Sequence, residues 1–286
     1  MSSLVTAVIT TNARPQYVYD ALASVCGETY PNVECLVVDD AGTFDLAGMS
    51  TARPVRVLRS EMGGVAIARN TGLAAASGEL VIFLDDDDIA LPGRIATLVD
   101  AMTRNRADAA FGQTRRVLAG SSVKLPTVPT AIVPSDHVGL CDILTCTPHV
   151  NSVLVRTAAL RAVGGFDASA AHFDDWSAWI RLADTKARIC SVRDVVAEWR
   201  IHDAGLSGKV LHIRAMKARI LALFDHLSHE LTEDGRREIA IARGVIAGSD
   251  VHTYDDYANV MAAARHTLHG SGSDVTIPPQ CERLSL

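Results

Sequence analysis

The stretch from residue 80 to residue 88, LVIFLDDDD, constrains the fold of this chain most strongly, because a fully apolar run stops at four consecutive aspartates. The run is rich in β-formers and does not alternate with polar residues, which is typical of a strand buried on both faces, as in a parallel sheet. Pro92 follows, and apolar residues then recur at helical spacing. The sequence therefore predicts a buried strand over 80–84, an acidic turn and a helix over 92–105.

Four adjacent carboxylates at the end of a strand, Asp85, Asp86, Asp87 and Asp88, repel one another. A divalent cation, or a ligand that carries one, relieves this repulsion, and hard oxygen ligands suit Mg²⁺ or Mn²⁺. The alternative is a solvated acidic loop that caps the next helix, since aspartate is favoured near helix N-termini. The local sequence leaves both interpretations open and favours the metal site.

The composition is that of an ordinary globular protein. The chain has 286 residues, of which 48% are hydrophobic and 21% charged, so one large α/β domain, or a domain with an appendage, is expected. A formal charge of -6 gives no general attraction to nucleic acid or anionic lipid. No apolar run approaches the roughly 18 residues of a membrane span, the first ten residues lack the features of a signal peptide, and the cysteines show no zinc-site spacing. We expect a cytoplasmic protein with no transmembrane segment and no nucleic-acid partner.

A second strand also ends in carboxylates. Residues 4–10 and 33–38 are predicted to be buried strands, with a helix over 15–26 between them, and the second strand ends at Asp39 and Asp40. Ligands bind at the carboxyl edge of open parallel sheets, so two acidic strand ends favour a binding site there. The first strand is followed by TTNARP, which has no glycine and therefore excludes a GxGxxG dinucleotide loop.

A third short strand is expected over 55–58, followed by a helix of small residues over 65–76 that Gly78 ends. Arg69 and Asn70 lie in this helix, just before the acidic strand. They are either a surface arginine beside a helix-weakening asparagine, or a cationic donor turned toward a nucleotide. The local sequence does not decide between the two.

Four motifs, in this order, resemble the family 2 glycosyltransferases, which have the GT-A fold: the first strand with TTNARP, then VVDDAG, then GVAIARNTGLAAASGE, then FLDDDD with IALP after it. The resemblance implies an α/β domain with a mostly parallel central sheet flanked by helices. It also implies a nucleotide-diphospho-sugar donor and a Mn²⁺ or Mg²⁺ cofactor. It ends near residue 208 and so covers about three quarters of the chain.

The resemblance assigns roles to residues of the first half. Asp87 matches the metal ligand of the family's DxD-type motif, whose other aspartates hold the donor ribose, and Asp39 matches a residue that contacts the base. The donor site implied in this way consists of Thr10, Thr11, Asn12, Arg14, Asp39, Arg69, Asp85 and Asp86. Thr11 is a departure, because the family often has an aromatic residue there that stacks on the base.

The second half begins with an expected strand over 107–118. A loop over 119–136, a short connector over 139–147 and a strand over 150–156 follow. Closing strands are predicted over 187–192 and 195–201.

An acidic pair, Asp174 and Asp175, follows GGFD and opens a helix that contains Trp176. An acidic pair at a helix start is more often a cap than a catalytic group. The resemblance reverses this preference, because the family places its catalytic base here: Asp175 matches the base, and Asp174 and Trp176 lie on the acceptor side. His202, after the last strand, matches a residue that contacts the metal or the diphosphate.

From residue 209 the pattern is helical, with further helices over 233–247 and 252–268 and an apolar stripe at Leu211, Met216, Ile220, Leu223, Phe224 and Leu227. We expect the stripe to pack on the catalytic domain, and a homodimer contact or a membrane-surface contact is the alternative. The predicted domains are a catalytic domain over 1–208, with a nucleotide-binding half (1–106) and an acceptor half (107–208), and a helical extension over 209–286.

The predicted function is the transfer of a sugar from a UDP-, dTDP- or GDP-sugar to the hydroxyl or amine of an unidentified acceptor, in one displacement with inversion. A metal-dependent sugar nucleotidyltransferase is the alternative among enzymes, although TTNARP lacks the glycines that such enzymes usually carry near the first strand. A catalytically silent nucleotide-sugar binding or scaffold protein is the alternative from another class. The combination of Asp87, Asp175 and His202 argues against it.

Overall fold

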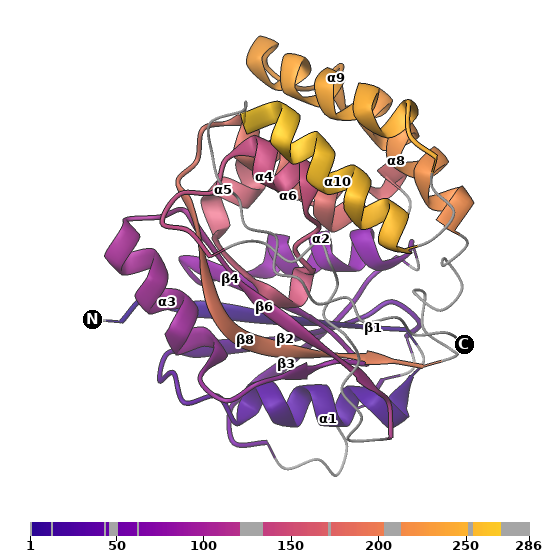
Figure 1. Cartoon of the computed structure of the whole chain (residues 1–286). Helices are drawn as coiled ribbons and strands as arrows, with labels where there is room; N and C mark the ends of the chain where they lie inside the picture. Colours follow the sequence, from indigo (N-terminus) through magenta and orange to yellow (C-terminus); the bar gives the residue numbers. More distant parts are fainter. Residues whose placement is uncertain are drawn as a thin grey trace.

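The computed structural model describes residues 2–12, 14–42, 44–45, 51–61, 63–120, 134–170, 173–202, 213–250 and 254–269. An eight-stranded sheet lies between two layers of helices (Figure 1). The strand order is β3-β2-β1-β4-β7-β6-β8-β5. The strands are β1 (Val5–Thr11), β2 (Val33–Asp39), β3 (Val55–Arg59), β4 (Leu80–Asp85), β5 (Ile89–Ala90), β6 (Ala109–Leu118), β7 (Val153–Arg156) and β8 (Ile189–Ile201).

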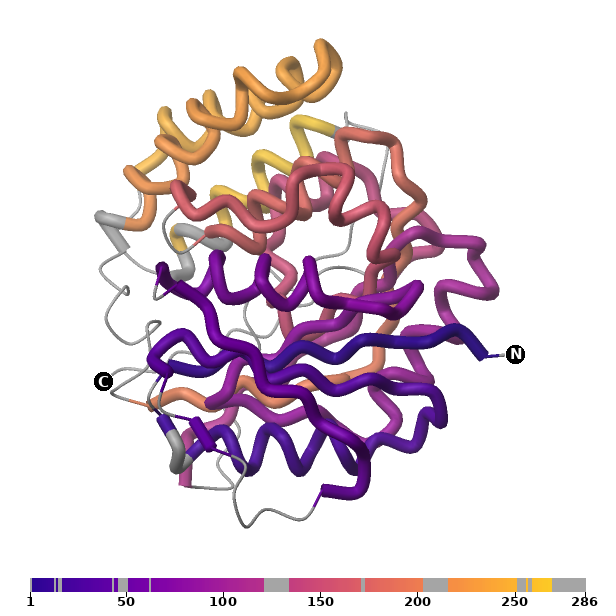
Figure 2. Tube along the Cα trace, turned by 180° about the vertical axis from the view of Figure 1, so that it is seen from behind, coloured from indigo at the N-terminus to yellow at the C-terminus, as the bar shows by residue number. Residues whose placement is uncertain are grey.

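Helices cover both faces of this sheet, and the view from behind shows the same two layers (Figure 2). One face carries α1 (Pro15–Cys26) and α3 (Arg94–Asn105). The other carries α2 (Val65–Ala75), α4 (Leu140–Thr145), α5 (Thr157–Ala162), α6 (Asp174–Asp184), α8 (Ile213–Leu227), α9 (Glu233–Ala247) and α10 (Tyr254–His269). Two short 3₁₀ turns, η1 (Val150–Ser152) and η2 (Ala168–Ala170), come directly before β7 and shortly before α6 in the chain.

The central strands are apolar on both faces, as the sequence predicts. Successive side chains point to opposite faces of a strand, and in β4 Val81 and Phe83 join the core under α2 while Ile82 and Leu84 join the core under α1 and α3. These four side chains are at most 1% exposed. The strand buried on both faces is therefore confirmed.

The sheet is parallel in its first half and mixed in its second. β3, β2, β1 and β4 are all parallel, β7 is antiparallel to both β4 and β6, and β6 is parallel to β8. Within the parallel half the register pairs Thr10 with Asp85 and Thr11 with Asp39. The acidic ends of β2 and β4 therefore meet the end of β1 at one edge of the sheet.

Three local predictions in the second half need correction. The connector over 139–147 contains a helix, α4, because Leu140, Ile143 and Leu144 bury an apolar face there and the Asp142 carboxylate accepts the amide of Gly139 at 2.9 Å. The first residues of the strand over 150–156 form η1. The two closing strands are one continuous strand, β8, because a register shift against β6 between Phe111 and residue 114 accommodates its exposed polar residues 193 and 194.

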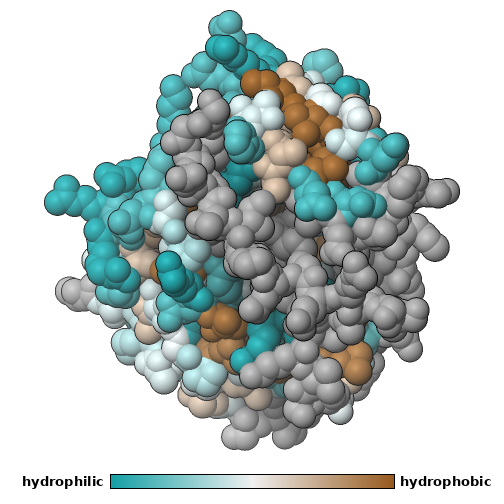
Figure 3. All heavy atoms as spheres, viewed as in Figure 1, coloured by the Kyte–Doolittle hydropathy of each residue, from teal (hydrophilic) through white to brown (hydrophobic). Residues whose placement is uncertain are grey.

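The apolar stripe packs against the core around α6, which agrees with the prediction that it packs on the preceding part of the chain. Ile220, Leu223, Phe224 and Leu227 are buried in the same core as Trp176, and the Phe224 and Trp176 rings lie 5.5 Å apart. Leu211 lies outside the described residues. On the face shown in Figure 3, a group of apolar side chains lies over α10, with polar side chains around it.

None of the helices in the described part of the chain has both the length and the apolar character that crossing a membrane requires. The cysteines of the described segments form no disulfide.

Gly78 does not end the helix, which stops at Ala75. It lies where β1 and β4 approach, and a Cβ at this position would stand 2.7 Å from the Leu4 oxygen and the Thr6 nitrogen and 2.8 Å from the Leu80 oxygen. These are backbone atoms, which cannot move aside without disturbing two central strands. Only glycine fits this place.

Gly78→Ala is therefore expected to lower the free energy of unfolding by roughly 1 to 3 kcal/mol, the usual cost of overpacking. Urea denaturation followed by circular dichroism measures it. Gly244→Ala in α9 is the matched control, because nothing lies within 4 Å of a Cβ there and alanine is the better helix former. Equal midpoints for Gly78→Ala and the wild type would contradict the close approach.

Candidate active site

The site lies at the carboxyl edge of β1, β2 and β4. The parallel ladder continues one step past the strands, since the Asp40 amide donates to the Thr11 oxygen at 2.9 Å and the Asp86 amide donates to the Thr10 oxygen at 3.2 Å. The backbone of both acidic ends is therefore fixed by the short threonine pair that ends β1. Asp39 and Asp85, which are 46 positions apart in the sequence, are thereby fixed on either side of β1 at one edge of the sheet.

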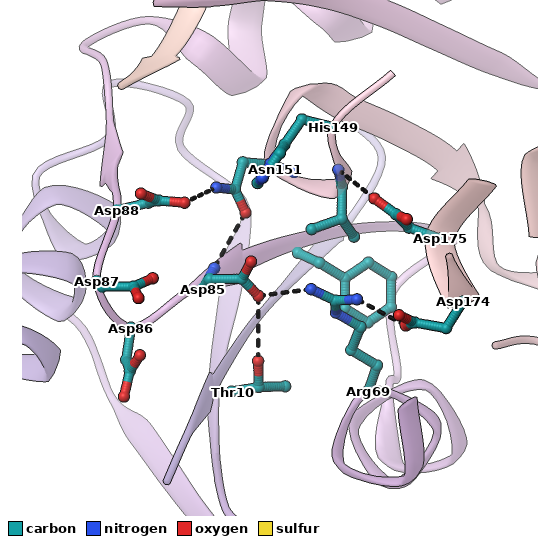
Figure 4. A network of polar contacts seen from close by, with 12 residues as sticks. Thr10, Arg69, Asp85, Asp86, Asp87, Asp88, His149, Asn151, Asp174 and Asp175 are labelled. Carbon is teal, nitrogen blue, oxygen red and sulfur yellow. Dashed lines mark hydrogen bonds and ion pairs between the residues drawn. The ribbon is translucent and has the colours of Figure 1, made fainter. Parts of the chain in front are cut away.

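Each of the first two aspartates of the run contacts other side chains of the protein, and Figure 4 shows the contacts of Asp85. The Asp85 carboxylate accepts from Arg69 at 2.7 Å and from the Thr10 hydroxyl at 3.5 Å. Asp86 is fully buried, accepts from the Thr11 hydroxyl at 2.6 Å and forms an ion pair with Arg14. Side chains of β1, α2 and the segment before α1 thus contact Asp85 Oδ1 and both carboxylate oxygens of Asp86.

The last two aspartates are paired as well. Asp87 Oδ2 lies 2.5 Å from Arg14 Nη1 and 3.0 Å from His202 Nε2. Asp88 is buried and accepts from the Asn151 amide group and, at 2.7 Å, from the backbone N–H of Arg200. The protein's own arginines therefore offset part of the repulsion within the run.

These surroundings separate the pKa values of the four carboxyls. Burial raises the pKa of Asp86 to about 7, against the opposing effect of Arg14. Burial and the neighbouring Asp87 raise the pKa of Asp88 well above its ordinary value. Asp85 is also desolvated, but Arg69 holds its pKa below the ordinary value. The edge therefore carries less negative charge at neutral pH than four free aspartates would.

The base candidate lies at the start of α6. Asp174 and Asp175 occupy the first helical turn, where the helix dipole favours negative charge. The Asp175 carboxylate accepts from the Trp176 amide at 2.8 Å and from the Val150 amide at 3.2 Å. Burial and the Asp174 charge raise the pKa of Asp175 to about 7. A partly exposed carboxylate with such a pKa can accept a proton near neutral pH.

Arg69 joins this turn to the acidic edge. Its Nη1 lies 2.6 Å from Asp174 and its Nη2 lies 2.7 Å from Asp85 (Figure 4). The residue is only 5% exposed, so it is not a surface arginine. The two terminal nitrogens pair with carboxylates of the protein, and a contact of Arg69 with a nucleotide stays a prediction.

Three residues that the sequence did not single out as site residues help to build the edge. Asn151 is fully buried: its Oδ1 accepts the Asp85 amide at 3.0 Å, and its Nδ2 donates to Asp88. His149 accepts the Asn151 amide at 3.4 Å and packs on the Trp199 ring at 4.9 Å. The backbone N–H of Arg200 donates to Asp88. An asparagine directly before a strand, in NSVLVR, was the available signal, but its partner is 63 residues away.

The remaining predicted residues lie as follows. Asp39 is buried, and its carboxylate accepts the amides of residues 41, 42 and 44 and pairs with Arg59, so contact with a base stays a prediction. Asn12 is exposed near the end of β1. Trp176 needs correction as an acceptor-side contact, because it is fully buried in the core and its indole N–H donates to the Ile143 oxygen at 2.6 Å.

At this edge of the sheet, two sets of side chains could hold a divalent ion. Asp87 Oδ2 and His202 Nε2 lie 3.0 Å apart, which matches the roughly 3 Å between adjacent ligands of an octahedral ion with bonds of about 2.1 Å. Asp85, Asp88 and His149 also offer one ligand atom each, all within 4.8 Å of one another. In both sets the carboxylates already pair with protein donors, Asp87 with Arg14 in the first and Asp85 and Asp88 with Arg69 and Asn151 in the second, so these contacts favour neither set.

Comparisons with known proteins show similarity to glycosyltransferases. Residues 6–129 match the family model described as "Glycosyl transferase family 2". An "Uncharacterized glycosyltransferase" of Rickettsia felis is 25% identical over 96% of this chain and 48% of its own length. The Escherichia coli protein named "UDP-Glc:alpha-D-GlcNAc-diphosphoundecaprenol beta-1,3-glucosyltransferase WfgD" is 24% identical over 82% of this chain and 89% of its own length. The matched part of the chain covers about half or less of the length of each of the first four curated relatives.

Solved structures show the same fold. The mannosyltransferase PcManGT from Pyrobaculum calidifontis, solved with GDP-Man and Mn²⁺, superposes with a TM-score of 0.65 at 17% identity, over 96% of this chain and 77% of its own. S. aureus TarS 1–349, solved with UDP-GlcNAc, gives a TM-score of 0.61 at 16% identity, over 92% of each chain. The fold is therefore that of GT-A glycosyltransferases.

The raised pKa of Asp175 predicts a pH-dependent cost to stability. Its carboxyl titrates at about 7 in the folded protein and near 3.8 when unfolded, so the unfolded state binds fewer protons between these values. This group therefore lowers the free energy of unfolding as the pH rises from about 4 to about 7. Asp175→Asn should remove roughly 1 to 3 kcal/mol of that decline.

Chemical denaturation of both proteins at pH 4.5, 6 and 8 measures the difference. The asparagine side chain has one acceptor oxygen fewer than the carboxylate, and this loss lowers stability equally at every pH. The slope of the free energy of unfolding against pH is therefore the informative quantity. Parallel stability curves for wild type and Asp175→Asn would contradict the raised pKa.

Proposed function

Because the chain belongs to glycosyl transferase family 2, we propose that it transfers a glycosyl unit from a UDP-, dTDP- or GDP-sugar to an acceptor hydroxyl or amine. The names of similar proteins support a nucleotide-sugar donor: TarS was solved with UDP-GlcNAc, and PcManGT with GDP-Man. These ligands are those of TarS and PcManGT; they indicate the class of donor expected for this chain, but not its sugar. The acceptor is unidentified.

One observation carries this proposal: a partly exposed carboxylate of raised pKa, Asp175, lies across Arg69 from an acidic edge. A binding protein needs an edge that recognises the donor, but it has no use for a proton acceptor on the opposite side. The burial of Asp86 and Asp88 leaves Asp85 and Asp87 as the aspartates of the run with exposed surface. The donor is therefore expected to lie against these two.

Asp175 is the general base in this proposal. Its carboxylate takes the proton of the acceptor O–H or N–H while the acceptor atom attacks the anomeric carbon. The bond between that carbon and the diphosphate oxygen breaks, and the nucleoside diphosphate leaves with the electron pair. A single base on one side and a leaving group on the other support one displacement with inversion.

Asp87 and His202 would hold Mn²⁺ or Mg²⁺, which, when bound, neutralises charge on the departing diphosphate. Arg14 pairs with the same Asp87 oxygen as His202, so its guanidinium would lie beside phosphates that are bound there. The threonines that end β1 orient Asp85 and Asp86. Each of these roles is electrostatic and needs no covalent intermediate.

The remaining proposals concern organisation. We propose a catalytic domain over residues 1–208 and a helical extension over 209–286 that shares its core with α6. Free, mostly buried cysteines in the described segments support a cytoplasmic location. A homodimer through the C-terminal helices remains a proposal as well.

Asp175→Asn is expected to lower transfer by about 100- to 10,000-fold, the usual contribution of a general base, while nucleotide binding stays within about twofold. Release of nucleoside diphosphate and calorimetric titration of the nucleotide measure the two effects. Asp184→Asn, the same change at the other end of α6, is the control and should retain activity. Normal turnover by Asp175→Asn would disprove the base assignment.

Asp87→Asn and His202→Ala are expected to weaken nucleotide binding at least about 10-fold in Mn²⁺ and to leave the weak binding in EDTA unchanged. A thermal-shift panel of UDP, GDP, CDP and dTDP with Mn²⁺, Mg²⁺ or EDTA detects this, since a ligand at 100 times its Kd stabilises by about 2.7 kcal/mol. Asp100→Asn, an exposed aspartate on α3, is the control. Full metal-dependent binding by both site variants would place the ion elsewhere.

A further inference from the structure

One arginine is shared by the donor side and the base side of the site. Arg69 extends from α2 between the end of β4 and the first turn of α6, with Asp85 at 2.7 Å and Asp174 at 2.6 Å (Figure 4). Its side chain is 6% exposed, and that of Asp174 is 7% exposed. The Arg69–Asp174 pair is therefore largely shielded from water, and removing one partner would leave a buried charge unpaired.

Asn70, the residue after Arg69, fixes the backbone at Phe166, which lies next to the Arg69 guanidinium. Asn70 donates to the Phe166 oxygen at 2.7 Å and accepts the Phe166 amide at 2.8 Å. The Phe166 ring lies 5.6 Å from the Arg69 guanidinium carbon, within reach of a cation–π contact. A Cβ at Gly165 would come within 2.4 Å of Asn70 Oδ1, so glycine is needed for this approach.

We propose that Arg69 is a positioning residue for the base: it holds Asp174, fixes the first turn of α6 and neutralises the charge beside Asp175, while its other ion pair ties that turn to Asp85. The catalytic meaning of this role rests on the proposed function. It differs from a nucleotide contact, because both terminal nitrogens of Arg69 face carboxylates of the protein.

The charged groups around Asp175 show how Arg69 affects the protonation of its carboxyl. Asp174 on α6 is the nearest like charge, Arg69 on α2 opposes it, and Asp85 on β4 adds a smaller repulsion. From η1 the Val150 amide donates to Asp175, with the imidazole of His149 one residue before it.

On α4, which also packs against α6, Asp142 is paired with Arg265 at 2.5 Å. Arg69 is therefore the arginine that offsets Asp174. Without it the Asp175 proton should be held more tightly, so the pKa of the base should rise.

The titration of Asp175 can be followed without turnover, because the amides of Val150 and Trp176 donate to its carboxylate. The experiment records the NMR shifts of these two amides against pH. In Arg69→Gln we expect their midpoint to move up by about one pH unit or more. In Arg69→Lys, which keeps the charge, the midpoint should stay within about half a unit of the wild type.

Arg181→Gln is the matched control, since Arg181 lies on α6 but donates to the Val163 and Gly165 oxygens. Its midpoint should be that of the wild type. Asp174→Asn removes the like charge and should move the midpoint down, which keeps the test decisive if Arg69→Gln does not fold. An unmoved midpoint in Arg69→Gln, or in Asp174→Asn when Arg69→Gln does not fold, overturns the proposal.

Turnover separates this inference from the proposed function. The acid limb of the kcat profile should shift with the NMR midpoint in each variant, with little change in the KM for the donor. A raised donor KM with an unmoved limb would mean that Arg69 contacts the nucleotide, and would overturn the inference. A wild type that releases no nucleoside diphosphate refutes the proposed function, and the amide titration still decides the role of Arg69.

Discussion

The two ion pairs of Arg69 are the interaction on which the candidate site depends. They bring together carboxylates from the end of β4 and the start of α6, which like-charge repulsion would otherwise drive apart. Removing one partner of a buried pair typically costs about 3 to 5 kcal/mol, so the distance between the acidic edge and the base candidate is strongly held. The Asn70 side chain adds two hydrogen bonds to the Phe166 backbone, donating to its oxygen and accepting from its amide. One turn of α2 therefore joins the two halves of the chain.

The sheet supplies the other constraint. Its parallel half sets Asp39 and Asp85 opposite the threonines that end β1, and antiparallel β7 then brings η1 alongside the acidic turn. Asn151 fills the gap between them and contacts both Asp85 and Asp88. Its backbone oxygen in turn accepts from the buried Arg94 at 2.5 Å. Each aspartate of the acidic turn is thus held by contacts with other groups of the protein, which suits a site that must bind charge without rearranging.

Helices and strands that depend on short-range sequence patterns were predicted well. The helix over 15–26 and the helix over 233–247 have the predicted bounds, and each strand of the parallel half lies within one residue of its predicted range. The partners of the site aspartates could not be predicted, because Asn151 and Arg200 contact Asp88 from 63 and 112 residues away. Trp176 was misjudged for a related reason: the pattern gave its helix, but the face that it buries depends on α4 and α8.

The central claim is that this edge binds a nucleotide sugar and releases a nucleoside diphosphate. ³¹P NMR of the protein incubated with UDP-, dTDP- and GDP-sugars in Mn²⁺, with water as the acceptor, tests it most directly. The account predicts that one donor yields nucleoside diphosphate, that EDTA abolishes its release, and that the Asp175→Asn protein yields far less. Cleavage between the two phosphates, or no reaction with any donor, would contradict it.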